Sequence, residues 1–122
     1  MAPRISLPIK PTMALARIGA GKLTWINPEL SAKVFGIKGE QSAYVGRLFG
    51  TRDIFLGLAV LSPNPAVRRN ALRVGIVIDA CDATAAVLET KQGKLTPFGS
   101  VLLIGGAAAF AVLGAIALSQ ED

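Results

Sequence analysis

The sequence has 122 residues, enough for one domain, and 52% of them are hydrophobic, with a mean hydropathy of +0.51. This composition indicates a membrane protein. The net charge of +5 favours an anionic lipid surface over nucleic acid, because the chain has no basic patch with interleaved aromatic residues and no recognizable nucleic-acid motif. A chain with one cysteine and no histidine cannot form an internal disulfide, the usual zinc or haem sites, or a histidine-assisted nucleophile. We therefore expect no enzyme activity, catalytic residue, metal or cofactor.

Three prolines in residues 1–12 predict an extended N-terminal arm. The apolar stretch 13–26 predicts the first helix, which at about 14 residues is short for a membrane crossing that needs about 20. The mixed stretch 29–41 predicts one turn of interfacial helix, ended by glycines.

Three longer apolar stretches predict helices over residues 42–62, 67–91 and 98–119. A Ser-Pro-Asn-Pro run separates the first two, which should form a helical hairpin. The last contains 22 residues without a charge and is long enough to cross a hydrocarbon layer of about 30 Å. The predicted fold is all-α, an integral membrane four-helix bundle with short helices, and residues 13–122 form a single membrane domain.

Small residues at helical spacing predict where these helices pack closely. A glycine stripe runs along the helix over residues 42–62, and a small-xxx-small pair occurs in the helix over residues 98–119. The expected packing residues are Gly46, Gly50, Gly57, Gly105 and Ala109.

Charged side chains interrupt the apolar stretches in equal numbers of each sign. A lone charge at the centre of a membrane helix costs about 3 kcal/mol, so pairing is expected. Asp79 and Asp82 project to one face of their helix and can share Arg47 or Arg17. We favour a structural role over a proton or ion path, because matched carboxylate and guanidinium groups stay charged near neutral pH. The predicted buried charge network is Arg17, Arg47, Asp53, Asp79 and Asp82.

Arg52 is expected outside this network, because it lies opposite the glycine stripe, where a single copy would expose it to lipid. Either its side chain extends to the membrane interface or another protein covers it. We favour a partner protein, contacted through Arg52 and through Pro8 and Pro11 of the arm.

The run YVGRLFGTRD at residues 44–53, followed by residues 73–82, is similar to small four-helix membrane proteins of actinobacteria with a DoxX-like layout, whose function is uncharacterised. In these proteins the first helix tends to end in a proline followed by Phe-Gly, as in residues 28–36. The resemblance covers most of residues 13–118. It implies a four-helix bundle with paired charges and supplies no catalytic residues.

Three functions fit these features. The first is a non-catalytic accessory subunit of a larger integral membrane complex of the envelope, and the resemblance suggests an actinobacterial lipid importer of the mammalian-cell-entry type. The second is a homo-oligomeric channel or carrier that uses the buried Arg/Asp pairs, and the third is a lipid- or quinone-binding membrane module. In each case we expect a multi-pass inner (plasma) membrane protein in contact with membrane lipid and not with nucleic acid. The arginine cluster at the start of the third predicted helix favours cytoplasmic termini.

Overall fold

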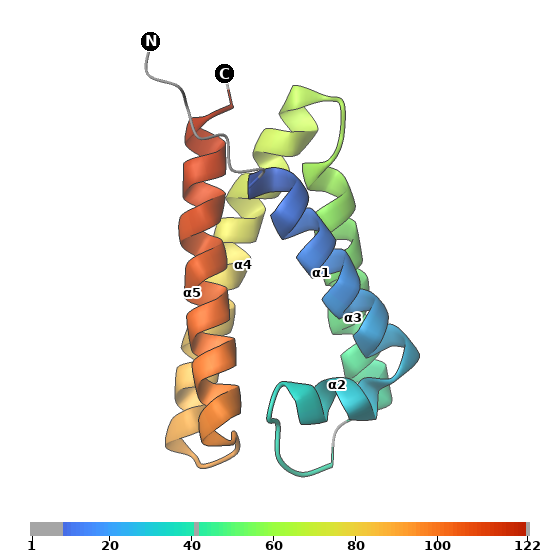
Figure 1. Ribbon diagram of the computed structural model, residues 1–122, viewed down its shortest axis with the longest axis vertical. Helices are drawn as coiled ribbons and strands as arrows, with labels where there is room; N and C mark the ends of the chain where they lie inside the picture. The colour runs from blue at the N-terminus through green and yellow to red at the C-terminus, as the bar shows by residue number, and fades with distance from the viewer. Residues whose placement is uncertain (1–8, 41, 122) are drawn as a thin grey trace.

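The chain is described by a computed structural model that covers residues 9–40 and 42–121. In this part of the chain the structure is all-helical, as predicted, with five helices (Figure 1). They are α1 (Ile9–Ile26), α2 (Pro28–Val34), α3 (Ala43–Val60), α4 (Pro65–Lys91) and α5 (Pro97–Ser119). The short helix α2 lies where one interfacial turn was predicted.

The predicted N-terminal arm is wrong at residues 9–12, which belong to α1. Pro11 lies in the first turn of this helix, where a backbone N–H would have no partner within the helix, so proline does not interrupt it. Pro8 and the rest of the arm lie outside the described residues.

Side-chain caps and prolines set the starts of the other helices. The side chains of Asn27, Ser42, Asn64 and Thr96 each accept a hydrogen bond from a backbone N–H in the first turn of the helix that follows. Proline is the first residue of α2, α4 and α5, where its fixed φ suits the helix. These are local signals, which explains why sequence alone placed most boundaries to within a few residues.

The four long helices form two antiparallel pairs, α1 with α3 and α4 with α5 (Figure 1). The pairs approach each other at the end where α1 begins and α5 ends, and they diverge toward the opposite end, where α2 lies across the base (Figure 1). The predicted hairpin of the helices now labelled α3 and α4 is therefore a minor contact. Each of these helices packs mainly on a helix that is not its neighbour across the proline loop.

Glycines bring α1 and α3 into backbone contact. A Cβ atom at Gly21 or at Gly50 would lie 2.6 Å from the carbonyl oxygen of the other residue. A Cβ at Gly57 would lie 2.8 Å from the carbonyl oxygen of Ala14, and one at Gly46 would lie 3.3 Å from the first residue of α2. The glycine stripe of α3 thus packs on α1 and α2, because only residues without side chains allow this approach.

The small-residue pair of α5 does not pack in this way. Gly105 and Ala109 are exposed, and a Cβ at Gly105 would meet no other atom of the described chain within 4 Å. The close contacts of α5 are at Gly99, where a Cβ would lie 2.4 Å from the carbonyl oxygen of Phe35, and at Gly114, which faces α4. Spacing identified a small face of α5, but Gly105 and Ala109 lie on the outside of the molecule, away from the cavity-lining side of α5, and no other helix of the described chain covers them.

Two loops join the helix pairs at the diverging end. The N–H of Lys38 donates to the carbonyl oxygen of Lys94 at 2.9 Å, and the N–H of Thr96 donates to that of Gly36 at 2.8 Å. Gly36 has a φ of +69°, and a Cβ there would lie 2.1 Å from the Thr96 hydroxyl oxygen. Only glycine satisfies both the conformation and the contact.

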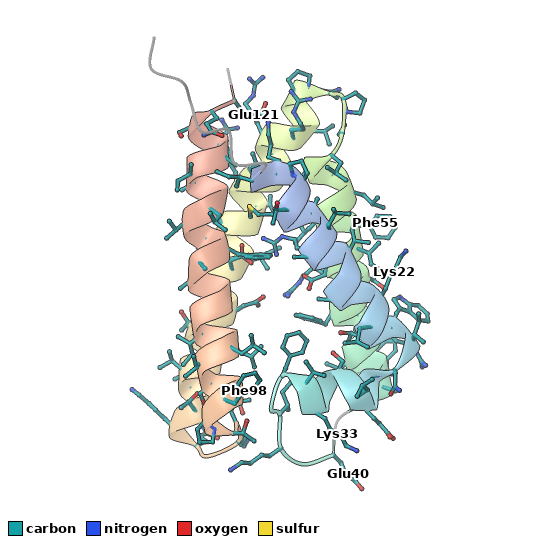
Figure 2. The ribbon with its side chains drawn as sticks, viewed as in Figure 1. Lys22, Lys33, Glu40, Phe55, Phe98 and Glu121 are labelled. Atoms are coloured by element: carbon teal, nitrogen blue, oxygen red, sulfur yellow. The ribbon has the colours of Figure 1, made fainter. Side chains whose placement is uncertain are left out.

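Many large apolar side chains lie on the outside. Among the described residues, eight hydrophobic side chains are buried, whereas twenty large ones are exposed. Phe55, for example, projects away from α3 (Figure 2). In the described part of the chain, α5 is the one helix both long and apolar enough to be a candidate membrane span.

Candidate functional site

A cavity of about 840 Å³ lies between the two helix pairs. This volume falls within the range of pockets that bind small molecules, roughly 300 to 1,000 Å³. The charge network forms its inner end, and α2 with the joined loops forms the other. The wall between these ends is mainly apolar and includes Ala20, Phe49, Ala85, Leu102, Gly106 and Phe110.

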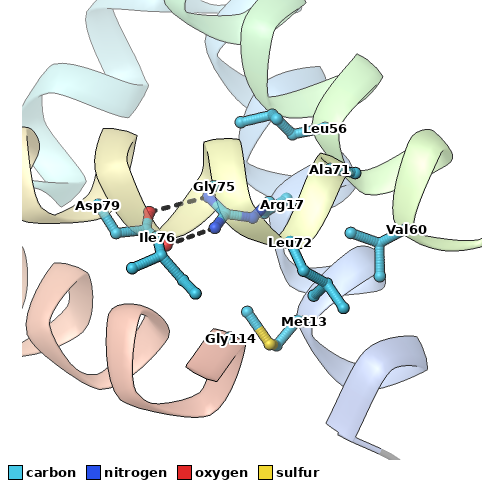
Figure 3. A pocket seen from close by; sticks show the side chains of 10 residues that line it. All are labelled: Met13, Arg17, Leu56, Val60, Ala71, Leu72, Gly75, Ile76, Asp79 and Gly114. Carbon is cyan, nitrogen blue, oxygen red and sulfur yellow. Dashed lines mark hydrogen bonds and ion pairs between the residues drawn. The ribbon is translucent and has the colours of Figure 1, made fainter. Parts of the chain in front are cut away.

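The inner end is formed by an ion pair between α1 and α4. Both terminal nitrogens of Arg17 donate to the carboxylate of Asp79, at 3.1 and 2.5 Å (Figure 3). The two side chains are only 6% and 4% exposed. The Arg17 guanidinium also lies 4.8 Å from the ring centroid of Phe110 in α5. One cation therefore connects three helices through charge-assisted and cation–π contacts.

The same ion pair separates the cavity from the packed end of the bundle. Arg17 and Asp79 also line a void of about 10 Å³, together with Met13, Val60 and Leu72 (Figure 3). That volume is at most enough for one water molecule. The large cavity is therefore closed toward the end where the helix pairs meet.

Arg52 pairs within the chain, so the prediction that it faces away from any internal partner is wrong. Its guanidinium donates to the Asp82 carboxylate at 3.3 and 2.8 Å and lies 4.7 Å from the ring centroid of Phe49. The pair is half-buried. Helix spacing places Arg52 opposite the glycine stripe of α3, but α4 lies within reach of its long side chain, and spacing alone does not reveal that neighbour.

Arg47 is exposed and lies outside the network in which it was predicted. Its Nε donates to the carbonyl oxygen of Trp25 at 3.1 Å, and the guanidinium lies 5.3 Å from that ring. The carbonyls in the last turn of a helix have no partner within the helix, and Arg47 satisfies one at the end of α1. About one and a half turns of α3 therefore separate an arginine that caps a neighbouring helix from one that pairs with α4.

Asp53 lies between the two ion pairs. Its carboxylate is 3.8 Å from a terminal nitrogen of Arg52 and 4.0 Å from one of Arg17, and it accepts no hydrogen bond from the described chain. The residue is 6% exposed and lines the cavity. Because two guanidinium groups face the carboxylates of Asp53, Asp79 and Asp82, one negative charge is left over.

The outer end of the cavity is polar. Lys38, Glu89 and Lys94 line it, and the ammonium of Lys94 lies 3.9 Å from the Glu89 carboxylate. Sequence reasoning missed this end, because loops distant in sequence create it. The aromatic rings beside the guanidiniums were not predicted either. Of these rings, that of Phe49 could have been found from the sequence, because Phe49 lies one helical turn before Arg52.

A second charge cluster fastens the opposite end of the molecule. Glu121 forms ion pairs with Arg68 of α4, at 3.1 Å, and with Lys10 of α1, and it lies beside the end of α5 (Figure 2). The hydrogen bonds from Arg68, then that from Lys10, lower the pKa of Glu121 to about 2. This cluster was not predicted.

Compared with protein-family models, curated proteins and solved structures, the chain matches none of them. The resemblance to DoxX-like membrane proteins therefore stays a prediction.

Proposed function

We propose that this is an integral membrane protein that binds an amphiphile with a lipid- or quinone-like apolar body in the cavity between its helix pairs. The observation that carries the proposal is the cavity of about 840 Å³, with mainly apolar walls that end on buried charges. Such a wall suits an apolar ligand, and the few polar groups at its ends would fix the orientation of that ligand.

Helix length and surface support the membrane location. The four long helices have 18 to 27 residues, which at about 1.5 Å per residue is roughly 27 to 40 Å, comparable with the hydrocarbon layer. Each of them exposes several large apolar side chains, while the Glu121 cluster and the Lys38–Lys94 loops lie at opposite ends. Arg17, Asp53 and Asp79 then lie near mid-membrane, where they face the interior of the bundle.

The geometry gives less support to the other two functions. The buried ion pair and the packed end leave a void of about 10 Å³, which does not favour a continuous ion path. The main support for an accessory subunit was the expectation that Arg52 has no partner within the chain, but Arg52 pairs with Asp82. The exposed apolar faces fit lipid as well as a partner protein.

Cys81 provides a test of membrane insertion. It is exposed near the middle of α4, so lipid should shield it from a charged, membrane-impermeant maleimide. A cysteine placed at Lys33 in a Cys81→Ser background lies at the diverging end and should react readily when that side of the membrane is accessible (Figure 2). Opened membranes provide that access, and detergent with denaturant should then unmask Cys81. Equal labelling rates at the two positions in opened membranes would rule out the proposed location.

Ligand binding is tested by native mass spectrometry of protein purified in mild neutral detergent. Gly106 lines the cavity, and its neighbour Gly105 is exposed on the outside of α5; a Cβ at either would meet open space in the described chain. We expect Gly106→Phe to fill the cavity and strongly reduce retained amphiphile, and Gly105→Phe to leave it unchanged. Equal occupancy in both variants, or no ligand in the wild type after incubation with membrane lipids, would contradict the proposal.

A further inference from the structure

We infer that the ligand is cationic, an alkylamine or alkylammonium amphiphile whose nitrogen lies against Asp53. This inference rests on the proposed ligand-binding function and names the ligand class. It is carried by three properties of the cavity: an incompletely paired buried carboxylate, the charge balance around it, and the apolar wall beyond it.

The first property is the state of Asp53. The residue is only 6% exposed, yet its carboxylate accepts no hydrogen bond from the described residues. The nearest guanidinium nitrogens are 3.8 and 4.0 Å away. Buried carboxylates normally accept several hydrogen bonds. Because Asp53 lines the cavity, a donor placed there could supply the missing contact.

The second property is charge. Arg17 and Arg52 each direct two nitrogens at a carboxylate other than that of Asp53. A neutral ligand would leave the extra negative charge uncompensated in a region of low dielectric constant, and an anionic ligand would add a second. A cation compensates it.

The third property is the difference between the two ends. Lys38 and Lys94 could attract an anion to the outer end, but Lys94 is 60% exposed and has Glu89 nearby. Exposed charges contribute little to binding because water screens them. Asp53 is shielded, so its charge should dominate selectivity, while the wall around Leu102 accepts the alkyl chain.

The experiment compares three probes with the same twelve-carbon chain in a neutral maltoside detergent: dodecylammonium, whose nitrogen can donate to Asp53, dodecylglycerol and dodecyl phosphate. Binding is measured by native mass spectrometry over a concentration series. We expect the cationic probe to bind wild-type protein roughly tenfold or more tightly than the other two, the size of one charge-assisted contact. Asp53→Asn should remove this preference. Glu29→Gln, which removes an exposed carboxylate of α2 outside the cavity, should keep it.

The outcomes separate the two proposals. Equal binding of all three probes to the wild type, or preference for the phosphate, overturns the cationic ligand while the ligand-binding function stands. A cationic preference that survives in Asp53→Asn also overturns it. Failure of every probe to bind the wild type overturns the ligand-binding function itself. The ranking on wild-type protein is decisive even if a variant does not fold.

Discussion

Arg17 of α1 and Asp79 of α4 form a two-bond ion pair that joins the two helix pairs of the molecule. Removing Asp79 leaves the buried Arg17 guanidinium without these two hydrogen bonds, and the Asp53 carboxylate, 4.0 Å away, replaces only part of the lost interaction.

We therefore expect Asp79→Ala to reduce the free energy of unfolding by about 2 kcal/mol or more, because two charge-assisted hydrogen bonds are lost. Thermal unfolding in detergent, followed by circular dichroism, measures the change. The double variant Arg17→Met with Asp79→Leu should recover much of the loss, because it replaces both charged members of the pair with apolar side chains. Wild-type stability of Asp79→Ala would show that the pair does not hold the helices together.

Asp53→Asn is expected to change stability much less, by about 1 kcal/mol or less in either direction, because this carboxylate accepts no hydrogen bond from the described residues. The same unfolding measurement applies. The substitution also removes the excess negative charge of the network, which offsets part of the lost attraction. A loss as large as that of Asp79→Ala would mean that Asp53 is bonded more tightly than the distances indicate.

Gly50→Ala should weaken the contact between α1 and α3. The new methyl group would lie 2.6 Å from the carbonyl oxygen of Gly21, and such overpacking typically costs about 1 to 3 kcal/mol. Gly19→Ala is the matched control on α1, because a Cβ there meets no atom of the described chain within 4 Å. It should be neutral or slightly stabilising, since alanine favours helix over glycine. Similar unfolding temperatures for the two variants would contradict the close approach.

Stability should fall in acid through Glu121. Its folded-state pKa of about 2 lies below the ordinary value of 4.5, so its ionised form stabilises the fold at any pH above about 4.5. This contribution is lost as the pH falls from about 4.5 to about 2. Unfolding temperatures measured across this window should decline in the wild type, and the decline should be smaller in Glu121→Gln. Parallel curves would show that the Lys10 and Arg68 contacts do not stabilise the fold.

Gly36→Ala should separate the loops that join the helix pairs. Gly39 also has a positive φ, of +84°, but a Cβ there meets no other described atom within 4 Å, so Gly39→Ala controls for backbone strain alone. Spin labels at Lys33 and Gln92, in a Cys81→Ser background, report the separation by electron–electron double resonance. We expect a longer or broader distance distribution only for Gly36→Ala. Unchanged distances in both variants would contradict the role of this contact.

Local structure could be predicted from the sequence, and the relations between helices only in part. The caps at Ser42 and Thr96 and the proline breaks act on neighbouring residues, so the long helices were predicted with small errors at their ends. The glycine stripe of α3 also gave its packing face, because close approach requires small residues wherever the partner lies.

The partners of the charges could not be predicted in the same way. Arg47 and Arg52 exchanged their expected roles, because pairing depends on which helix lies beside each turn of α3. The cavity could not be predicted for a related reason. It is the space between two diverging helix pairs, and no pattern of residues along the sequence indicates such a space.

The two helix pairs are joined at both ends of the molecule. Glu121 with its two basic partners joins them at one end, and the loop hydrogen bonds at Gly36 and Lys38 join them at the other. Widening the cavity therefore requires the two helix pairs to move apart along their sides while both ends stay joined. For a molecule in a bilayer, that direction leads into the acyl chains. An amphiphile already dissolved in one leaflet would enter and leave the cavity sideways, without passing through water.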